Sequence, residues 1–299
     1  MKRKPNLFIV GAPKCGTTAI STWLAEHPDV YFSPDKEPHH FYCPHAPRMS
    51  RKDYEALFAD VRGERIIAEG SVWYLYSQQA LELIYKFNPD ARIVICLRNP
   101  VDMVISLHSQ WLSGGIETVA SLEEAWRLRS LDGDGLSDGV PPEDFEPVAY
   151  ELAGQLGTQL ERAYQIFPKE RVHTILLDDV RRDPKAIWEA LLTFLDIAQD
   201  GREDFPVVNA AKAAKNSRLQ QVIHFVRKEK WKLRIPLNLG VLTAVHNWNL
   251  YEKPNSVPMA VRRMLTEAFL DEMRLMESLL QKDLSAWYAD QTPAQKLAS

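Results

Sequence analysis

A loop bounded by two glycines, set between an apolar run and an amphipathic segment, constrains this chain most. Residues 7–18 read LFIVGAPKCGTT, and the four apolar residues at the start, without polar alternation, predict a buried strand. The apolar spacing that follows predicts a helix over about 17–26. Such a strand, loop and helix N-terminus form a cradle for an anion. The spacing of Gly11 and Gly16 matches a phosphate-binding P-loop, but Lys14 lies before the second glycine instead of after it.

A second motif of the same kind lies near residue 98. Residues 91–100 read ARIVICLRNP, an apolar strand that ends in Arg98. Asn99 suits a helix N-cap and Pro100 the first helical turn. At ~1.5 Å per residue, Ser106 would lie roughly 9–10 Å further along this helix. A guanidinium and a hydroxyl so placed can bracket one phosphate. The alternatives are a surface ion pair for Arg98 and a hydroxyl bonded to its own helix for Ser106.

The two motifs together resemble those of sulfotransferases that use 3′-phosphoadenosine-5′-phosphosulfate (PAPS). The PKCGTT hexapeptide resembles the family's 5′-phosphosulfate loop, and LRNP with Ser106 resembles its 3′-phosphate site. The resemblance implies an α/β fold with three αβα layers, a central parallel sheet and one domain over 1–299. It places the nucleotide motifs in 7–110 and lets the C-terminal part complete the acceptor cleft. The cofactor-binding residues that it implies are Lys14, Cys15, Gly16, Thr17, Thr18, Arg98 and Ser106.

A third segment, KEPHHFY at 36–42, resembles a segment of heparan-type and bacterial sulfotransferases in which the glutamate is the general base. The resemblance assigns that role to Glu37, with Lys14 stabilising the bridging oxygen of the leaving product, PAP. His39 is the alternative base, or the group that orients Glu37, whereas His40 is expected to be structural. A positioned base suits this chemistry because an alcohol is a poor nucleophile. The scattered His and Cys residues predict no metal site.

The acceptor is less well defined by the sequence. The EGSVWYL segment at 69–75 resembles the E-K-[ST]-P-x-Y-F segment of heparan-type enzymes, but Gly70 replaces the lysine. This puts a glycosaminoglycan acceptor in doubt and leaves a hydroxyl on a small molecule, lipid, polyketide or carbohydrate. Trp73, Tyr74 and Tyr76 could line the acceptor site or belong to the core. No C-terminal phosphate loop of the family is recognisable, and Lys253 or Arg218 could take its place.

Two other functions remain open. The apolar strand before Asp178 and Asp179 resembles a Walker B element, which would suit a nucleotide kinase or NTPase. The displaced Lys14 argues against that chemistry, and a sheet strand with a polar end explains the segment equally well. A module that binds PAP without turnover is the third alternative, and the presence of Lys14 and Glu37 argues against it.

Composition and periodicity set the remaining expectations. A net charge of −4 gives no support for nucleic-acid binding, and three scattered cysteines predict no disulfide framework. No apolar run is long enough for a membrane span, so we expect a cytoplasmic protein. Residues 132–147 are expected to form a surface loop, and the aromatic residues within 199–255 either line a site or pack in the core. Strands are predicted near 7–10, 29–33, 65–69, 92–97 and 172–177, and helices near 17–26, 78–86, 100–112, 121–130, 149–166, 184–195, 216–229 and 258–281.

Overall fold

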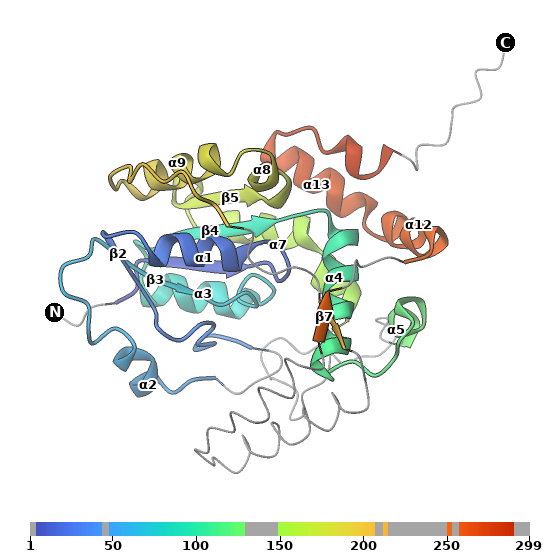
Figure 1. The fold of residues 1–299 in the computed structure, drawn as a ribbon, viewed down its shortest axis with the longest axis horizontal. Helices are drawn as coiled ribbons and strands as arrows, with labels where there is room; N and C mark the ends of the chain where they lie inside the picture. The colour runs from blue at the N-terminus through green and yellow to red at the C-terminus, as the bar shows by residue number, and fades with distance from the viewer. Residues whose placement is uncertain are drawn as a thin grey trace.

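A five-stranded parallel sheet forms the centre of the protein (Figure 1). The computed structural model describes residues 4–43, 48–128, 149–206, 212–214, 250–252 and 257–289. The strand order is β2-β3-β1-β4-β5, and each pair of neighbours is parallel. The strands are β1 (Leu7–Gly11), β2 (Val30–Phe32), β3 (Ile66–Gly70), β4 (Arg92–Leu97) and β5 (Val172–Leu176). All five strands predicted from the apolar runs are therefore confirmed, each within two residues of its expected bounds.

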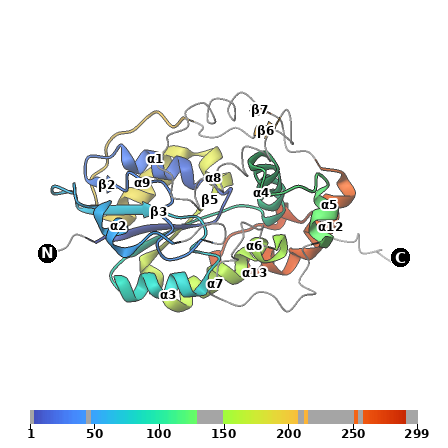
Figure 2. The ribbon, with the colours of Figure 1, turned by 90° about the horizontal axis from the view of Figure 1, so that it is seen from below.

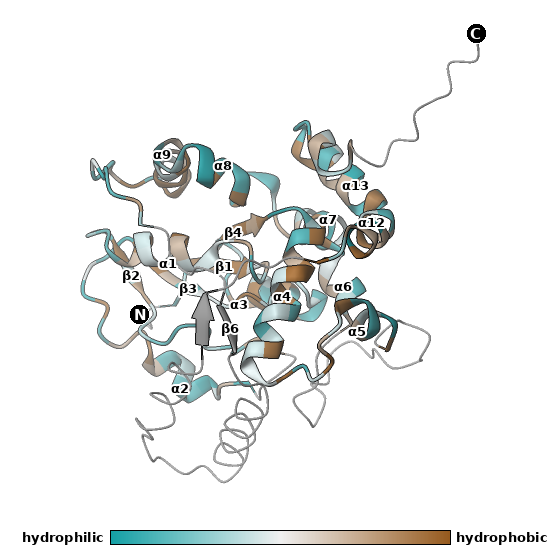
Figure 3. Cartoon of the chain, turned by 45° about the vertical axis from the view of Figure 1, so that its right-hand side comes forward, coloured by the Kyte–Doolittle hydropathy of each residue, from teal (hydrophilic) through white to brown (hydrophobic). Residues whose placement is uncertain are grey.

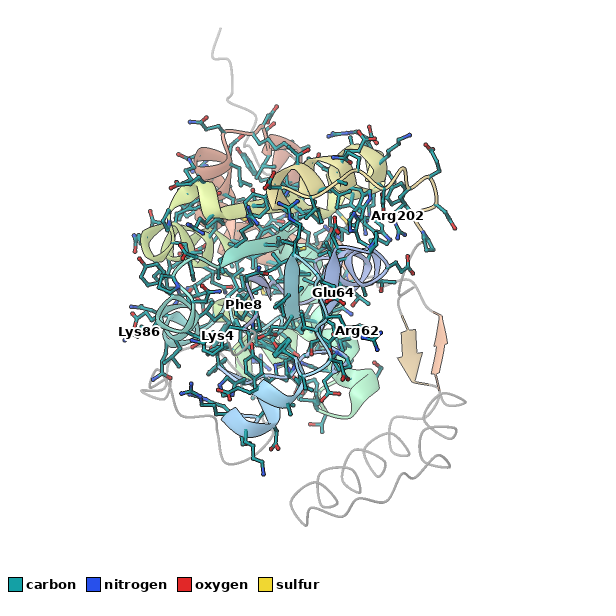
Figure 4. The ribbon with its side chains drawn as sticks, turned by 90° about the vertical axis from the view of Figure 1, so that its left-hand side faces the viewer. Lys4, Phe8, Arg62, Glu64, Lys86 and Arg202 are labelled. Atoms are coloured by element: carbon teal, nitrogen blue, oxygen red, sulfur yellow. The ribbon has the colours of Figure 1, made fainter. Side chains whose placement is uncertain are left out.

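The central strands lack polar alternation because both of their faces are covered. Leu7 to Val10 are fully buried, and Ile93 to Leu97 are fully buried beside them. Figure 3 shows β1 and β4 in the brown of apolar residues, and Figure 4 shows Phe8 inside the molecule while Lys86 and Arg62 lie at its periphery. Each large apolar side chain buried here contributes about 1.5–3 kcal/mol. This burial fixes β1 and β4 side by side at the centre.

Helices cover the two faces of the sheet. Figure 2 shows α1, α8 and α9 on one side and α3 and α7 on the other. The helices of the described residues are α1 (Thr17–Ala25), α2 (Arg51–Ala56), α3 (Gln78–Phe87), α4 (Pro100–Gly114), α5 (Leu122–Leu128), α6 (Tyr150–Gly154), α7 (Leu156–Ile166), α8 (Leu177–Arg182), α9 (Pro184–Leu195), α12 (Met259–Ala268) and α13 (Leu270–Leu280), with short 3₁₀ turns at Lys169–Arg171 and Ser285–Trp287. A separate pair, β6 (Lys212–Ala214) and β7 (Leu250–Glu252), is antiparallel. The αβα layers predicted by the resemblance are confirmed.

The order of the strands determines where a ligand can bind. The chain runs from β1 to β2 and β3 on one side of the sheet, and then crosses to β4 and β5 on the other. The switch point lies between β1 and β4, which pair directly, with Leu7 opposite Arg92. Ligands of open α/β sheets bind outside the carboxyl ends of the strands at such a point. The two loops singled out in the sequence both leave from there.

Two helices that the apolar spacing predicts as continuous are each divided in two. The segment predicted as 149–166 breaks at Gln155 between α6 and α7, and the segment predicted as 258–281 breaks at Phe269 between α12 and α13. The two breaks pack against each other. The buried ring of Phe269 occupies the place where a Cβ on Gly154 would be, 2.2 Å from the ring. The apolar periodicity continues through both breaks, so the sequence did not reveal them.

Other expectations have mixed outcomes. The six-residue helices α2 and α8 were not predicted, because so short an element shows too few turns of apolar spacing. The predicted helix at 216–229, the loop at 132–147, and Lys253, Arg218, Trp231, Trp248 and the Tyr251 side chain lie outside the described residues. Cys15, Cys43 and Cys96 are free and buried, as the absence of a disulfide framework requires. In the described part of the chain, no helix has the length and apolar character to cross a membrane.

Candidate active site at the carboxyl edge of the sheet

The loop between β1 and α1 is built so that only glycine fits at both of its ends. Gly11 has φ 149°, and a Cβ there would lie 2.6 Å from the Val72 carbonyl oxygen. Gly16 has φ 89°, and a Cβ there would meet the Leu177 side chain at 2.9 Å. Helix α1 then begins at Thr17 with no side-chain cap. Its first N–H groups have no intrahelical acceptor, so this helix end is suited to an anion.

Three cations gather around this uncapped helix end. The Arg98 guanidinium donates to the backbone carbonyl of Lys14 (3.2 Å), and the Lys36 ammonium donates to the Thr18 hydroxyl (3.0 Å). Burial lowers the pKa of Lys14, and the charges of Arg98 and Lys36 lower it further. Within the described residues, no carboxylate lies in salt-bridge distance of the Lys14 ammonium. Three cations therefore lie close together and, among the residues that the structure describes, only Arg98 has a carboxylate in salt-bridge distance, Asp102 at 3.7 Å, which favours an anionic ligand.

The other predicted residues of the β1–α1 loop and the start of α1, Cys15, Thr17 and Thr18, differ in their burial and in their contacts. The Cys15 thiol is buried and donates to the Pro13 carbonyl (3.3 Å), and burial raises its pKa to about 12. Any contact of Cys15 with an anion would therefore come from its backbone N–H. Thr17 is also buried, whereas the Thr18 hydroxyl faces Lys36. Lys36 was not predicted as a site residue, although it begins the segment that carries Glu37.

The junction between β4 and α4 differs in that its helix end is capped. The Asn99 side chain accepts from the Val101 N–H (2.9 Å), and Pro100 occupies the first turn, as predicted. At this junction, the group that can bind an anion is therefore the Arg98 guanidinium and not the N-terminus of α4. Burial lowers the pKa of Arg98, while Asp102 at 3.7 Å opposes that effect.

A second arginine completes the charge arrangement behind Arg98. Arg262 of α12 pairs with Asp102 at 2.6 Å, so Asp102 is shared between a residue of the LRNP motif and one from the C-terminal region. Neither Asp102 nor Arg262 was predicted, because Arg262 is distant in sequence and has no motif around it. Ser106 lies half-buried on α4, and its role remains a prediction.

Glu37 and His39 face each other on the loop that follows β2. Their side chains approach to 3.4 Å between Oε2 and Nε2, and both are partly exposed. Burial alone would lower the pKa of His39, but interactions with Cys43 and Glu37 outweigh it and raise the pKa to about 10. The charge of Glu37 also acts on Lys14, which places this loop beside the β1–α1 loop. The raised pKa favours the protonated form of His39 beside the Glu37 carboxylate.

Backbone strain is concentrated at these residues. Lys14, Glu37 and His39 have left-handed φ values of 63°, 58° and 52°. In the described ranges, the other non-glycine residues with such angles are Asp196 and Gln281, which end α9 and α13. Left-handed backbone costs a non-glycine residue roughly 1–2 kcal/mol outside a helix end. The predicted catalytic residues are therefore those that the fold holds in unfavourable conformations.

The neighbouring aromatic and histidine residues are structural. His40 bonds the Met49 carbonyl oxygen through Nδ1 (2.8 Å) and stacks on Tyr54 at 4.3 Å, as its expected structural role requires. Tyr74 is fully buried, and Trp73 is nearly so and stacks on Trp111. Of the two interpretations of these aromatic residues, the structure supports the core for Trp73 and Tyr74.

The two acidic residues that resemble a Walker B element both bind other side chains of the protein. Asp178 and Asp179 lie in the first turn of α8, after the end of β5. Asp178 accepts from the Trp287 indole N–H (3.0 Å), and Asp179 pairs with Arg182 and Lys282. These contacts agree with the simpler interpretation, in which the polar end of a sheet strand lies at the carboxyl edge. Where the structure describes the chain, His, Cys, Asp and Glu residues form no group of three that could hold a metal ion.

Comparison with known proteins identifies the class. The model of the sulfotransferase domain family matches residues 4–234, and the chain therefore belongs to this family. The solved sulfotransferase of Alicyclobacillus acidocaldarius is 27% identical with a TM-score of 0.69, over 95% of this chain and 99% of that one. A mouse sulfotransferase, SULT7A1, solved as a complex with PAP, shares the fold at 15% identity, with a TM-score of 0.51 over 93% and 90% of the chains.

Curated relatives match a smaller part of the chain. Heparan sulfate glucosamine 3-O-sulfotransferase 6 of Mus musculus is 33% identical over 112 residues, which cover 38% of this chain and 32% of that protein. The membrane-associated sulfotransferase kil1 of Dictyostelium discoideum is 22% identical over 265 residues, covering 64% and 56%. The chain thus spans about a third of the length of the heparan sulfate relative and about half of the second.

Proposed function

We propose that the protein transfers a sulfuryl group from PAPS to a hydroxyl acceptor and releases PAP. The observation that carries the proposal is the set of three cations, Lys14, Lys36 and Arg98, around an uncapped helix end with Glu37 beside them. Such a site suits a ligand with several anionic groups and a reacting centre next to a carboxylate. Membership in the sulfotransferase family supports the same conclusion.

In the proposed reaction, the acceptor oxygen attacks the sulfur of PAPS in line with the bridging oxygen. Glu37 takes the acceptor proton as the new O–S bond forms, and the old S–O bond breaks. Negative charge grows on the bridging oxygen of PAP, and Lys14 stabilises it there more than in the ground state. The 5′-phosphate would bind the N–H groups at Gly16, Thr17 and Thr18, and the 3′-phosphate would bind Arg98 and Ser106.

The contacts of Glu37 and His39 favour Glu37 as the base. Interactions with Cys43 and Glu37 raise the pKa of His39, which favours the protonated imidazole, and a protonated imidazole has no lone pair for the acceptor proton. His39 would instead hold the Glu37 carboxylate in position by its 3.4 Å contact. The sequence alone left these two roles open.

Calorimetric titration with PAP in EDTA, and in parallel with ATP plus Mg²⁺, tests the cofactor. We expect PAP to bind without metal and ATP to bind weakly. Preferential binding of Mg-ATP would overturn the proposal in favour of the NTPase. Transfer is then measured with [³⁵S]PAPS and a panel of 4-nitrophenol, cholesterol and N-sulfated heparosan, and as the slow release of [³⁵S]sulfate to water.

Replacement of the proposed base separates catalysis from binding. Glu37→Gln should fold normally, bind PAP as the wild type does, and lose ~10²–10⁴-fold in sulfuryl transfer, because a carboxamide cannot accept the proton. Glu26→Gln, at the far end of α1, is the matched control and should keep wild-type turnover. Near-wild-type transfer by Glu37→Gln would move the role of base to another group. A wild type that binds PAP but turns over no PAPS would indicate a binding module.

A further inference from the structure

A buried carboxylate that the proposed reaction does not use lies directly below the Glu37–His39 loop. Glu69, at the end of β3, is fully buried. One of its carboxylate oxygens accepts from the Tyr54 hydroxyl (3.0 Å) and the other accepts from the Ser71 hydroxyl (2.9 Å). A buried carboxylate is costly to desolvate, so a chain keeps one where its hydrogen bonds serve a purpose.

Ser71 links this carboxylate to the loop. The Ser71 oxygen accepts the backbone N–H of His39 at 3.2 Å while its own proton goes to Glu69. A serine hydroxyl has one proton, so donation to Glu69 fixes its rotation and directs a lone pair at His39. Glu69 thereby determines which way the hydroxyl points.

The loop needs such an anchor because of its backbone. Glu37 and His39 both have left-handed φ values, with Pro38 between them. The contact from Ser71 acts on the residue whose side chain touches Glu37. Further along, the Phe41 N–H reaches the Tyr74 hydroxyl at 3.4 Å. The same buried cluster therefore holds the loop at two points.

We propose that Ser71, oriented by Glu69, is a positioning residue that holds the His39 backbone and so keeps the His39 imidazole against Glu37. This inference rests on the proposed function, because it assigns Ser71 to the geometry of the proposed base. Ser71 is fully buried and touches no reacting group. Its effect is expected on turnover and not on nucleotide affinity.

Ser71→Ala tests the inference against a matched control, Ser77→Ala. Ser77 is also buried, and its hydroxyl also accepts one backbone N–H, that of Ala80 at the start of α3. Both variants lose a hydroxyl that accepts one backbone N–H, but Ser71→Ala also loses the bond to Glu69, so its melting temperature should fall further than that of Ser77→Ala. We expect Ser71→Ala to release [³⁵S]sulfate from [³⁵S]PAPS at least tenfold more slowly, with an unchanged Kd for PAP. Ser77→Ala should keep the wild-type rate.

Equal rates for Ser71→Ala and Ser77→Ala would overturn the inference while leaving the proposed function intact. A wild type that neither binds PAP nor consumes PAPS would overturn the proposed function instead. If Ser71→Ala does not fold, Glu69→Gln provides the test. Its amide replaces one accepting oxygen by an N–H₂ group, so one of the two hydroxyls must turn away.

The pH dependence of sulfate release separates a positioning role from a loss of stability, which would not change the pH profile. Burial raises the pKa of Glu69 to about 7. Hydrogen bonds from Ser71, Tyr54 and Tyr74 and the charge of His39 act in the opposite direction. His40 also lies nearby, stacked on Tyr54. Only the ionised form accepts from both hydroxyls, so sulfate release should rise with pH through about 7. Glu69→Gln should lose this limb of the profile and have a rate at pH 8 below that of the wild type. An unchanged limb in Glu69→Gln would overturn the role given to Glu69.

Discussion

The two junctions at the carboxyl edge are built from the same parts and present different groups to a ligand. Each is a buried central strand followed by a loop and a helix, β1 to α1 and β4 to α4. At the first, Gly16 in the left-handed region precedes a helix with no side-chain cap. At the second, Asn99 caps the helix and Pro100 fills its first turn. One helix end is left open for an anion, and the other is closed by the chain itself.

We propose that this difference lets one fold hold two phosphate groups in different ways. An open helix end surrounds an anion with backbone N–H groups, whose direction is fixed and which every substitution except proline leaves in place. At a capped helix end, a side chain must bind the anion instead. Here that side chain is Arg98, whose guanidinium donates to the Lys14 carbonyl. We expect the first junction to govern the reacting phosphosulfate and the second to govern recognition of the 3′-phosphate.

Lys14→Ala is the change with the largest expected effect on this comparison. Lys14 would stabilise charge that develops only during transfer, so turnover of PAPS should fall by ~10²–10³-fold, with a much smaller loss of PAP affinity. Single-turnover release of [³⁵S]sulfate and calorimetry with PAP measure the two quantities. Lys86→Ala, at the exposed end of α3 (Figure 4), is the matched control and should change neither. Equal losses in turnover and affinity would show that Lys14 holds the ground state.

Arg98→Ala should produce the complementary result. The loss of a charged hydrogen bond, about 1.5–3 kcal/mol, predicts a PAP affinity weaker by roughly 10–150-fold. Adenosine 5′-phosphosulfate lacks the 3′-phosphate, so its affinity should change little. Titration of both ligands into Arg98→Ala, with Arg65→Ala as an exposed control, checks this expectation. A parallel loss for both ligands would remove Arg98 from the 3′-phosphate site and weaken the division between the junctions.

The two junctions were readable in the sequence because each is local. The strand, the breaking glycines or the Asn-Pro pair, and the helix lie within about a dozen residues, and the cap at Asn99 follows directly from its type. The contacts between junctions were not readable. Arg262 reaches Asp102 from 160 residues away, and the bond from Arg98 to the Lys14 carbonyl depends on strand order. Ser71 and Glu69 were not predicted as site residues for the same reason, since His39, which Ser71 contacts, lies on another loop.

Asn99→Ala is the smallest and sharpest test of the comparison. Loss of the cap should lower the free energy of unfolding by ~1 kcal/mol, which chemical denaturation measures. Ser50→Ala, which removes the equivalent cap of α2, should cost a similar amount. PAP affinity should stay within about twofold, because the N–H of Val101 is bonded to a side chain and is not offered to a ligand. A clear gain or loss of PAP affinity in Asn99→Ala alone would mean that the start of α4 takes part in phosphate binding, and the two junctions would then differ in degree and not in kind.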